Sequence, residues 1–259
     1  MAEVDWDERA RQGTGLQSVI DPGDRHGLKN ALIDRIQWGC VGPWAATRRA
    51  VLDYGCGIGR FAQRIVAQGA AYTGTDASAA MIEAAQRLHG VPSGAPASGR
   101  TGPVFLHAPA PPLPLPDGSF DGCLTVGVLQ CLQTADGAPL RAALADIARV
   151  LAPGGELLMI EQASASGRHS GSVAHSASEQ DYRDALAPHF EVASLQRLRL
   201  GGLSRFSGVY LRHGRWLPGR PAVEIALARH EARRAATADE AALRAQVYHD
   251  VALRAVRRA

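Results

Sequence analysis

The stretch VLDYGCGIGRF, residues 51–61, decides the fold of this 259-residue chain. Its first residues predict a short buried strand. Gly55, Gly57 and Gly59 then lie in a turn that precedes apolar residues at helical spacing. Glycine tolerates a positive φ and lets a ligand approach the backbone closely. Because the first amide groups of a helix lack partners within it, we expect a strand, a ligand-binding turn and a helix here.

The spacing of these glycines indicates the kind of ligand. A dinucleotide-binding turn has the pattern GxGxxG, whereas this chain has GxGxG with Asp53 two residues before Gly55. A carboxylate repels a pyrophosphate and attracts an ammonium group. The turn therefore favours a ligand with a cationic part over a nicotinamide dinucleotide.

A second acidic residue follows at the spacing of a strand–helix–strand unit. Asp76 ends a predicted strand, 17 residues after Gly59. A carboxylate at this place can accept two hydrogen bonds from the hydroxyls of a ribose. Its alternative role is to open the next turn together with Ser78, which is placed to cap the following helix. We favour the ribose, because the acid and the glycine turn occur together.

Strands alternate with helices as far as residue 162, which predicts an α/β fold with a mostly parallel sheet and helices on both faces. An antiparallel pair is expected to close the sheet near the end of the chain. The predicted strands are 51–54, 72–76, 104–107, 120–129 and 156–162, the closing pair is 190–200 and 205–213, and the predicted helices are 60–68, 79–88, 141–151, 179–186 and 221–258. The expected organisation is a helical lead-in or lid (1–48), a ligand-binding domain (49–213) and a C-terminal helical extension (214–259).

Composition excludes several classes of protein. With 46% hydrophobic and 20% charged residues, the chain can bury a sizeable core. A net charge of +3 is small for a nucleic-acid-binding protein. The four cysteines form no CxxC pair, so neither a disulfide framework nor a metal site is expected, and a reducing cytoplasm fits best. The polar, acidic start predicts no signal peptide, and no apolar run is long enough to span a bilayer.

Four segments in order carry a resemblance to a known family: DYGCGIGR, TDAS, LPLPDGSFDGCLTVGVLQCL and ADIARVLAPGGELLMIE. Together they resemble the small-molecule branch of the class I S-adenosylmethionine-dependent methyltransferases, over about residues 40–212. The resemblance implies a Rossmann-like, mostly parallel seven-stranded sheet with an antiparallel closing strand. It also implies S-adenosylmethionine as the methyl donor and S-adenosylhomocysteine as the product.

The resemblance assigns three parts of the cofactor to residues of this chain. Asp76 would hold the ribose hydroxyls. The branch usually has an aspartate for the adenine amino group near Pro109, so here either a backbone carbonyl or His107 replaces it or the adenine is held more weakly. The implied cofactor residues are Asp53, Tyr54, Gly55, Cys56, Gly57 and Arg60 at the methionine end, Ala77, Met81, Ala108 and Pro109 around the adenine, and Gly127 and Val128 beside the sulfonium.

Methyl transfer from a sulfonium is an in-line displacement that needs alignment, exclusion of water and sometimes a base. The candidate bases are Glu161, at the end of a strand, and His169 and His175, in the Ser/Gly/His-rich segment that follows. Each of the three has a purely structural alternative. The residues expected to contact the acceptor are Trp6, Gln130 and Tyr182.

We expect methyl transfer to an O, N or C atom of a small metabolite, such as a natural-product intermediate. One alternative is an S-adenosylmethionine-binding protein of the same fold with non-methylating chemistry. A nicotinamide-dependent reductase is a weaker alternative. A nucleic-acid methyltransferase is disfavoured, because GVLQ (127–130) stands where an NPPY-like motif is required. The expected partners are a small-molecule acceptor and at most a second copy, with no nucleic acid and no membrane.

Overall fold

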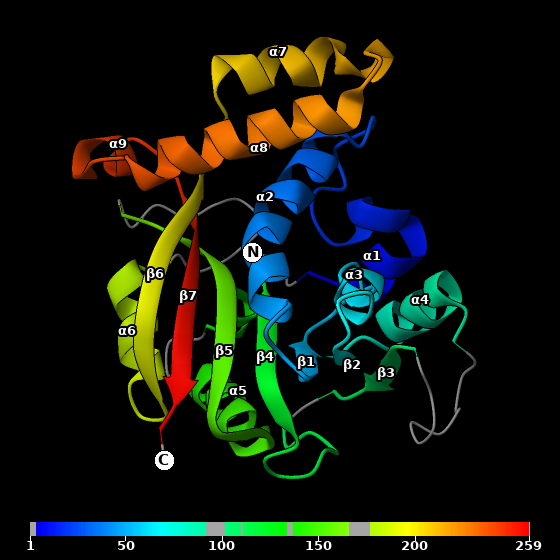
Figure 1. The fold of residues 1–259 in the computed structure, drawn as a ribbon, viewed down its shortest axis with the longest axis vertical. Coiled ribbons are helices and arrows are strands. Elements are labelled where there is room, and N and C mark those ends of the chain that lie inside the picture. Colours follow the sequence, from blue (N-terminus) through cyan, green and yellow to red (C-terminus); the bar gives the residue numbers. More distant parts are fainter. Residues whose placement is uncertain (1–3, 92–101, 110, 134–136, 166–176, 259) are drawn as a thin grey trace.

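The computed structural model describes residues 4–91, 102–109, 111–133, 137–165 and 177–258 (Figure 1). Its strands are β1 (Ala50–Tyr54), β2 (Ala71–Asp76), β3 (Val104–His107), β4 (Phe120–Val126), β5 (Leu151–Ala163), β6 (Phe190–Leu200) and β7 (His249–Arg257). They form one sheet in the order β3-β2-β1-β4-β5-β7-β6. β7 runs antiparallel to both of its neighbours, while the other pairs are parallel. The predicted fold class is confirmed.

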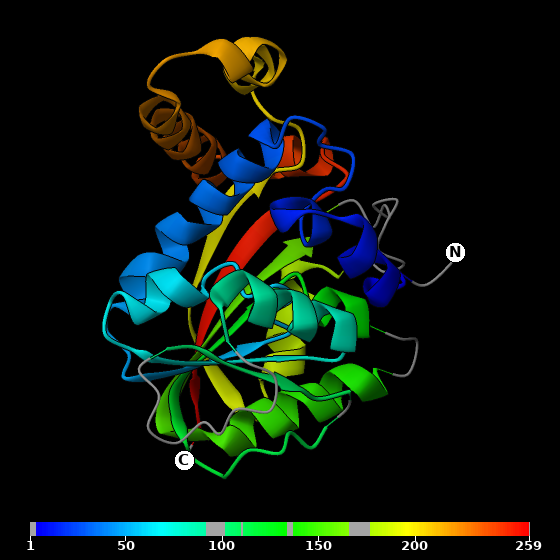
Figure 2. The same cartoon turned by 90° about the vertical axis from the view of Figure 1, so that its right-hand side faces the viewer.

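Helices cover both faces of the sheet (Figures 1 and 2). They are α1 (Trp6–Gln12), α2 (Leu28–Ala45), α3 (Ala62–Val66), α4 (Ala79–His89), α5 (Ala138–Val150), α6 (Glu179–Leu186), α7 (Arg205–His213), α8 (Arg220–Ala236) and α9 (Glu240–Arg244). Three short 3-10 helices are η1 (Gly15–Ser18), η2 (Leu129–Leu132) and η3 (Gly214–Trp216). Among the described residues, no helix is long and apolar enough to cross a bilayer.

Two hydrophobic cores lie on opposite faces of the sheet. Leu144 and Ile147 of α5 and Leu186 of α6 pack on one face. The other face carries α2, α3, α4 and α8, with Ile36 and Ile65 among the buried side chains. The β-strands between them are buried on both sides, which is typical of a parallel sheet. This packing fixes the positions of the strand ends at which ligands bind.

After residue 204 the structure differs from two sequence predictions. Residues 205–213 form helix α7 and not a strand, because Ser204 caps them by accepting the amide of Ser207 and because buried Ser207 and Tyr210 are three residues apart. The predicted helix at 221–258 ends early, and β7 takes the closing position between β5 and β6. The boundary expected at residue 213 therefore does not mark the end of the sheet domain.

The lead-in helix α1 lies over the start of α4. The carboxylate of Asp7 accepts hydrogen bonds from the hydroxyl of Ser78 at 2.5 Å and from the amide of Ala80 at 3.3 Å. Ser78 also caps α4 by accepting the amide of Met81. The predicted cap is thus confirmed, and it also fastens α1 beside the end of β2.

Because β7 lies inside the sheet, it should contribute strongly to stability. Leu253 is fully buried in β7, so we expect Leu253→Ala to lower the free energy of unfolding by about 2–5 kcal/mol. Urea unfolding measures the change. The matched control Leu88→Ala removes the same atoms from a side chain that is 59% exposed, and it should change stability little. Equal losses in the two variants would contradict an internal β7.

Candidate active site

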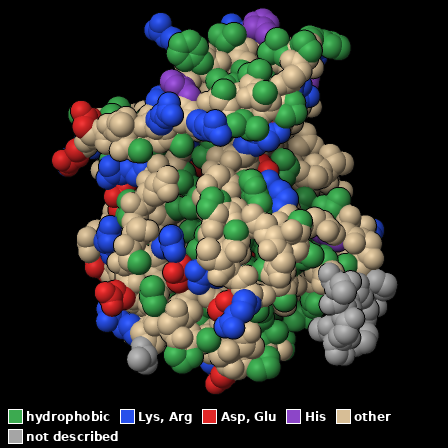
Figure 3. All heavy atoms as spheres, viewed as in Figure 1, with side chains coloured by type: hydrophobic (Ala, Val, Ile, Leu, Met, Phe, Trp, Pro, Cys, Tyr) green, Lys and Arg blue, Asp and Glu red, His purple; other side chains and the backbone are tan. Residues whose placement is uncertain are grey.

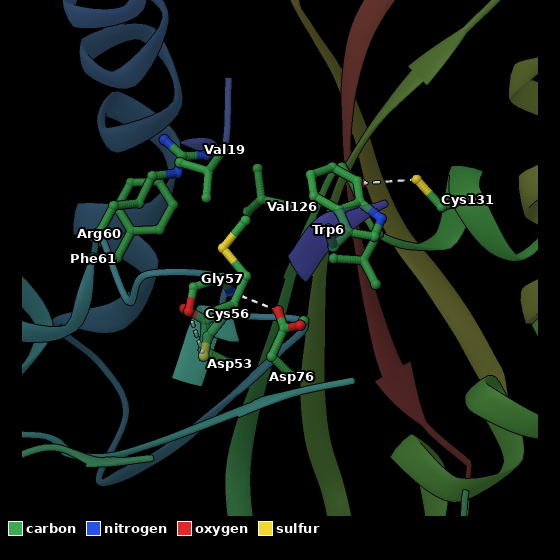
Figure 4. Close-up of a pocket in the computed structure, with 14 residues that line it drawn as sticks. Trp6, Val19, Asp53, Cys56, Gly57, Arg60, Phe61, Asp76, Val126 and Cys131 are labelled. Carbon is green, nitrogen blue, oxygen red and sulfur yellow. Dashed lines mark hydrogen bonds between the residues drawn. The ribbon is translucent and has the colours of Figure 1, made fainter. Parts of the chain in front are cut away.

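A cavity opens at the carboxyl edge of β1, β2 and β4 (Figure 4). Figure 4 shows Trp6 and Asp76 on one side, Arg60 and Phe61 on the other, and Gly57 between them. Its volume is about 110 Å³. The residues that line it are Trp6, Val19, Asp53, Gly55, Cys56, Gly57, Arg60, Phe61, Asp76, Met81, Val126, Gly127, Val128 and Cys131.

The glycine turn after β1 has the geometry that its sequence predicts. Gly57 has a φ of +54°, and a Cβ atom added there would lie 2.7 Å from Cγ1 of Val19. Gly55 has a φ of +73°, and its added Cβ would meet Val128 at 2.4 Å. The amides of Gly55 and Cys56 both donate to the carbonyl of Thr75. Only glycine fits these two positions, and its small size leaves the backbone open to the cavity.

Asp76 joins the turns that follow β1 and β2. One carboxylate oxygen accepts the amide of Gly57 at 2.8 Å, and the other accepts the amide of Ser78 at 2.9 Å. Burial raises the pKa of Asp76, and these two hydrogen bonds oppose the rise. A carboxylate has about four acceptor sites, so two remain for a ligand diol. The two roles that the sequence left open for Asp76, ribose and turn, are therefore compatible.

Asp53 ends in the same cavity but is more deeply buried. Its side chain is 4% exposed and accepts a hydrogen bond from the hydroxyl of Tyr72 at 2.6 Å. Burial raises the pKa of Asp53 to about 6, while Tyr72 and the charge of Arg60 act to lower it. At neutral pH the carboxylate is mostly ionised, which suits a cationic ligand group.

Arg60 connects the glycine turn to α2. Its guanidinium pairs with Asp34 at 2.9 Å, donates to the amide oxygen of Gln37 at 2.6 Å and lies 4.1 Å from the ring centre of Phe61. Burial lowers the pKa of Arg60, and Asp34 opposes that effect. Arg60 therefore supports the wall of the cavity with its charge already paired.

Glu161 holds the loop that follows β4. Its carboxylate accepts the amides of Val128, Leu129 and Gln130, each at 3.1 Å, and lies 3.5 Å from the hydroxyl of Thr125. Burial raises the pKa of Glu161 to about 7, and these hydrogen bonds oppose the rise. Three of these donors approach Oε1, whereas the amide of Gln130 alone approaches Oε2. Glu161 thus positions the loop, and these contacts leave little of its carboxylate free to act as a base.

A second cavity of about 510 Å³ adjoins the first. The two share six lining residues: Trp6, Val19, Arg60, Val126, Gly127 and Cys131. The remaining walls come from α1, the segment around η1, α2, and the ends of β5, β6 and β7. The further lining residues include Arg9, Asp21, Lys29, Ile33, Gln37, Gln130, Glu161, Gln162, Arg199, Tyr248 and Asp250.

Charged groups in the second cavity are mostly paired with each other. Arg199 and Asp250 form a buried bidentate ion pair with distances of 2.9 and 3.0 Å. Lys29 pairs with Asp21 at 2.6 Å. The Arg9 guanidinium donates to the carbonyl of Ile20, and its buried Nε has no hydrogen-bond partner among the described residues. The cavity is therefore polar, with little net charge.

The structure brings most of the predicted site residues together. All of the predicted cofactor residues line the first cavity except Tyr54, Ala77, Ala108 and Pro109. Gln130 lines the second cavity, where its side-chain oxygen accepts the amide of Gln162. His107 is exposed and hydrogen-bonds the carbonyl of Ala77, so it faces the turn after β2.

Other predicted residues fall elsewhere. Tyr182 is 1% exposed, belongs to the core beneath α6 and donates to the carbonyl of Gln162. It lines neither cavity, so we drop it from the acceptor-contacting set. His169 and His175 lie outside the described residues. Within those residues no cluster of three or more His, Cys, Asp or Glu could hold a metal ion, and all four cysteines are free thiols.

Sequence reasoning missed several lining residues. Phe61 and Val126 flank recognised motifs, so a search one residue further would have included them. Val19 had no signal, because it comes from the lead-in and reaches the cavity only through the tertiary fold. Tyr248 and Asp250 were missed because their segment was expected to be helical, whereas Tyr248 directly precedes β7 and Asp250 lies at its start.

The strands that form this edge of the sheet belong to a segment that matches a known family. Residues 52–159, from β1 to β5, match the family described as "Methyltransferase domain". This region is similar to methyltransferase domains, and the match covers less than half of the chain. The resemblance inferred from four sequence segments is therefore confirmed, and the glycine turn, Asp76, Gly127 and Val128 all lie within the matched residues.

Individual relatives match about half of the chain. Malonyl-(acyl-carrier protein) O-methyltransferase of Erwinia billingiae is 36% identical over 133 residues, which are 50% of this chain and 46% of that protein. Demethylmenaquinone methyltransferase of Tropheryma whipplei is 30% identical over 146 residues, 55% of each chain. The chain thus spans about half the length of the curated relatives it matches.

A solved structure supports the fold over a longer range. The (4+2)-cyclase SpnF has a TM-score of 0.52 and 21% identity, and the match covers 85% of this chain and 81% of that one. At this identity the likeness shows the fold alone. The match to this structure covers more of the chain than residues 52–159 do.

Because Glu161 holds the loop after β4, Glu161→Gln should speed the hydrogen exchange of the amides in that loop. An amide side chain offers one acceptor oxygen in place of two, so at least one of the amides of Val128, Leu129 and Gln130 loses its partner. We expect hydrogen exchange of these amides to accelerate about tenfold or more. Glu156→Gln, on the same strand and paired with Arg254, is the control and should leave them unchanged. If these amides exchange in Glu161→Gln at the wild-type rate, Glu161 does not position the loop.

Proposed function

We propose that the protein transfers a methyl group from S-adenosylmethionine to a small-molecule acceptor. The observation that carries the proposal is the shared wall of Val126 and Gly127 between two cavities. One cavity has the glycine turn and paired carboxylates that suit the cofactor, and the other has room for an acceptor. A sulfonium placed at the shared wall would face the second cavity.

The residues present suit this cofactor part by part. The carboxylate of Asp53 suits the ammonium group, and the two remaining acceptor sites of Asp76 suit the ribose hydroxyls. Met81, fully buried beneath the first cavity, offers an apolar surface for the adenine. When bound, S-adenosylmethionine supplies an activated methyl group. The task of the chain is then to orient it and to exclude water.

The first cavity is too small for the whole cofactor as it stands. Ligand sites commonly have volumes of roughly 300–1,000 Å³, whereas this one measures about 110 Å³. Trp6 on α1 closes part of it, and α1 is fastened through Asp7 to Ser78. We propose that α1 swings outward when the nucleoside enters and closes again over it, which would exclude water from the reacting atoms.

The acceptor would occupy the second cavity, whose polar lining suits a small polar metabolite. Gln130, Tyr248 and the Arg199–Asp250 pair present hydrogen-bonding groups there. Close to Gly127, the carboxylate of Glu161 is largely engaged by the amides of the loop after β4. We therefore propose an acceptor atom that is nucleophilic without help from a side chain described here.

Calorimetric titration tests the cofactor. We expect the protein to bind S-adenosylmethionine and S-adenosylhomocysteine in the micromolar range and to ignore NADH. Asp76→Asn should weaken both by about tenfold or more, because it removes charge-assisted hydrogen bonds. Asp117→Asn, a 78% exposed side chain, is the matched control and should bind normally. Binding of NADH, or of neither sulfur compound, would refute the assignment. Binding without turnover over a broad acceptor panel would favour non-methylating chemistry.

The ionisation of Asp53 should make the affinity for S-adenosylmethionine depend on pH. Since burial raises its pKa to about 6, Asp53 gains a proton as the pH falls through that value and loses its attraction for the ammonium group. The affinity for S-adenosylmethionine should therefore fall by up to about tenfold per pH unit on the acid side. Titrations between about pH 5 and pH 8 measure this slope. Asp53→Asn should bind more weakly with a flatter profile, and an unchanged slope would contradict the role of Asp53.

A further inference from the structure

Exposed hydrophobic side chains gather on one end of the molecule. We call this part, residues 205–225, the α7–α8 hairpin; it comprises α7, η3 and the start of α8 (Figures 1 and 2). Of seven large hydrophobic side chains that are exposed in the described residues, five lie here: Phe206 (70%), Val209 (62%), Trp216 (78%), Leu217 (44%) and Ile225 (41%). A scattered exposed side chain is ordinary, but such a concentration marks an interaction surface.

The same hairpin carries more positive than negative charge. No Asp or Glu occurs between Val192 and Val223. Within the described part of the chain, Arg205, Arg212 and Arg215 take part in no ion pair, and only Arg220 pairs, with Glu224 at 3.5 Å. Figure 3 shows green and blue atoms side by side at this end. The outward face is therefore both apolar and cationic.

Buried acids hold the hairpin in place from beneath. Glu224 accepts the hydroxyl of Tyr210 at 2.5 Å and pairs with Arg35 of α2 at 2.7 Å. Glu231 accepts the hydroxyl of Ser207 at 2.5 Å. These contacts account for the acids of α8 on its inner side. They also leave Trp216 and Phe206 projecting on a firmly attached support.

We propose that the α7–α8 hairpin binds the surface of an anionic lipid membrane. Tryptophan and phenylalanine beside arginine suit the boundary between lipid headgroups and acyl chains. Arginines near such a surface gain from its negative potential. A second copy of the chain is a poorer partner, because a symmetric contact would bring these arginines against each other. The proposal replaces the expectation of no membrane contact and is independent of methyl transfer.

The α7–α8 hairpin is connected to the second cavity through α2. α8 packs on α2, and α2 supplies Lys29, Ile33 and Gln37 to the second cavity. A membrane bound at the hairpin would therefore lie at the end of the molecule next to that cavity. This consequence rests on the proposed function: a polar acceptor held at the lipid headgroups would then be concentrated near the second cavity.

Flotation with vesicles tests the proposal on the full chain. We expect binding to vesicles of phosphatidylcholine mixed with phosphatidylglycerol, and little binding to phosphatidylcholine alone. Phe206→Ser with Trp216→Ser, and separately Arg205→Gln with Arg212→Gln and Arg215→Gln, should each weaken binding about tenfold or more. The charge control replaces Arg49, Arg87 and Arg244 by Gln. These side chains are 93%, 69% and 65% exposed and lie away from the hairpin, and the change in net charge is the same.

Three outcomes would overturn the proposal. One is failure of the wild-type protein to bind the mixed vesicles, and another is an equal loss in the control triple variant. The third is a concentration-dependent dimer in ultracentrifugation that Phe206→Ser with Trp216→Ser abolishes, since it would assign the surface to a second copy. Trp216→Phe gives an independent reading. It should keep vesicle binding but lose the blue shift of tryptophan emission that wild type shows.

Discussion

The hydrogen bonds of the Asp76 carboxylate are the constraint on which the site depends. Through them the end of β2 holds both the glycine turn after β1 and the start of α4. The same start of α4 fastens the lid helix α1 through Asp7 and Ser78. One buried acid thus links three segments from different parts of the chain. Each of these segments contributes to the walls of the first cavity.

A second buried acid repeats this arrangement on the other side of the site. Glu161 at the end of β5 accepts the amides that follow β4, much as Asp76 accepts the amides that follow β1 and β2. Val126 and Gly127 come directly before the amides that Glu161 holds, and they belong to the wall shared by the two cavities. A preorganised backbone of this kind can align a sulfonium and an acceptor without rearranging during the reaction. Positioning, more than acid–base chemistry, is what the described residues provide.

The sequence predicted the parts of the molecule that local patterns determine. The glycine turn, Asp76 and the strands through β5 follow from residue types at fixed spacing, and they are where expected. β7 was missed because a strand buried on both faces shows no alternation, and its alanines and arginines favour a helix. Tyr182 was expected to contact the acceptor, whereas its hydroxyl donates to a carbonyl in the core. Val19 could not be predicted, since only tertiary packing brings it to the cavity.

A crystal structure of the protein with S-adenosylhomocysteine tests the central claim most directly. The account predicts that both ribose hydroxyls lie within hydrogen-bonding distance of the Asp76 carboxylate. The amino group should lie near Asp53, and the sulfur should lie at the wall formed by Val126 and Gly127. A ligand bound elsewhere, or a ribose remote from Asp76, would contradict the assignment of this edge of the sheet as the methyl-donor site.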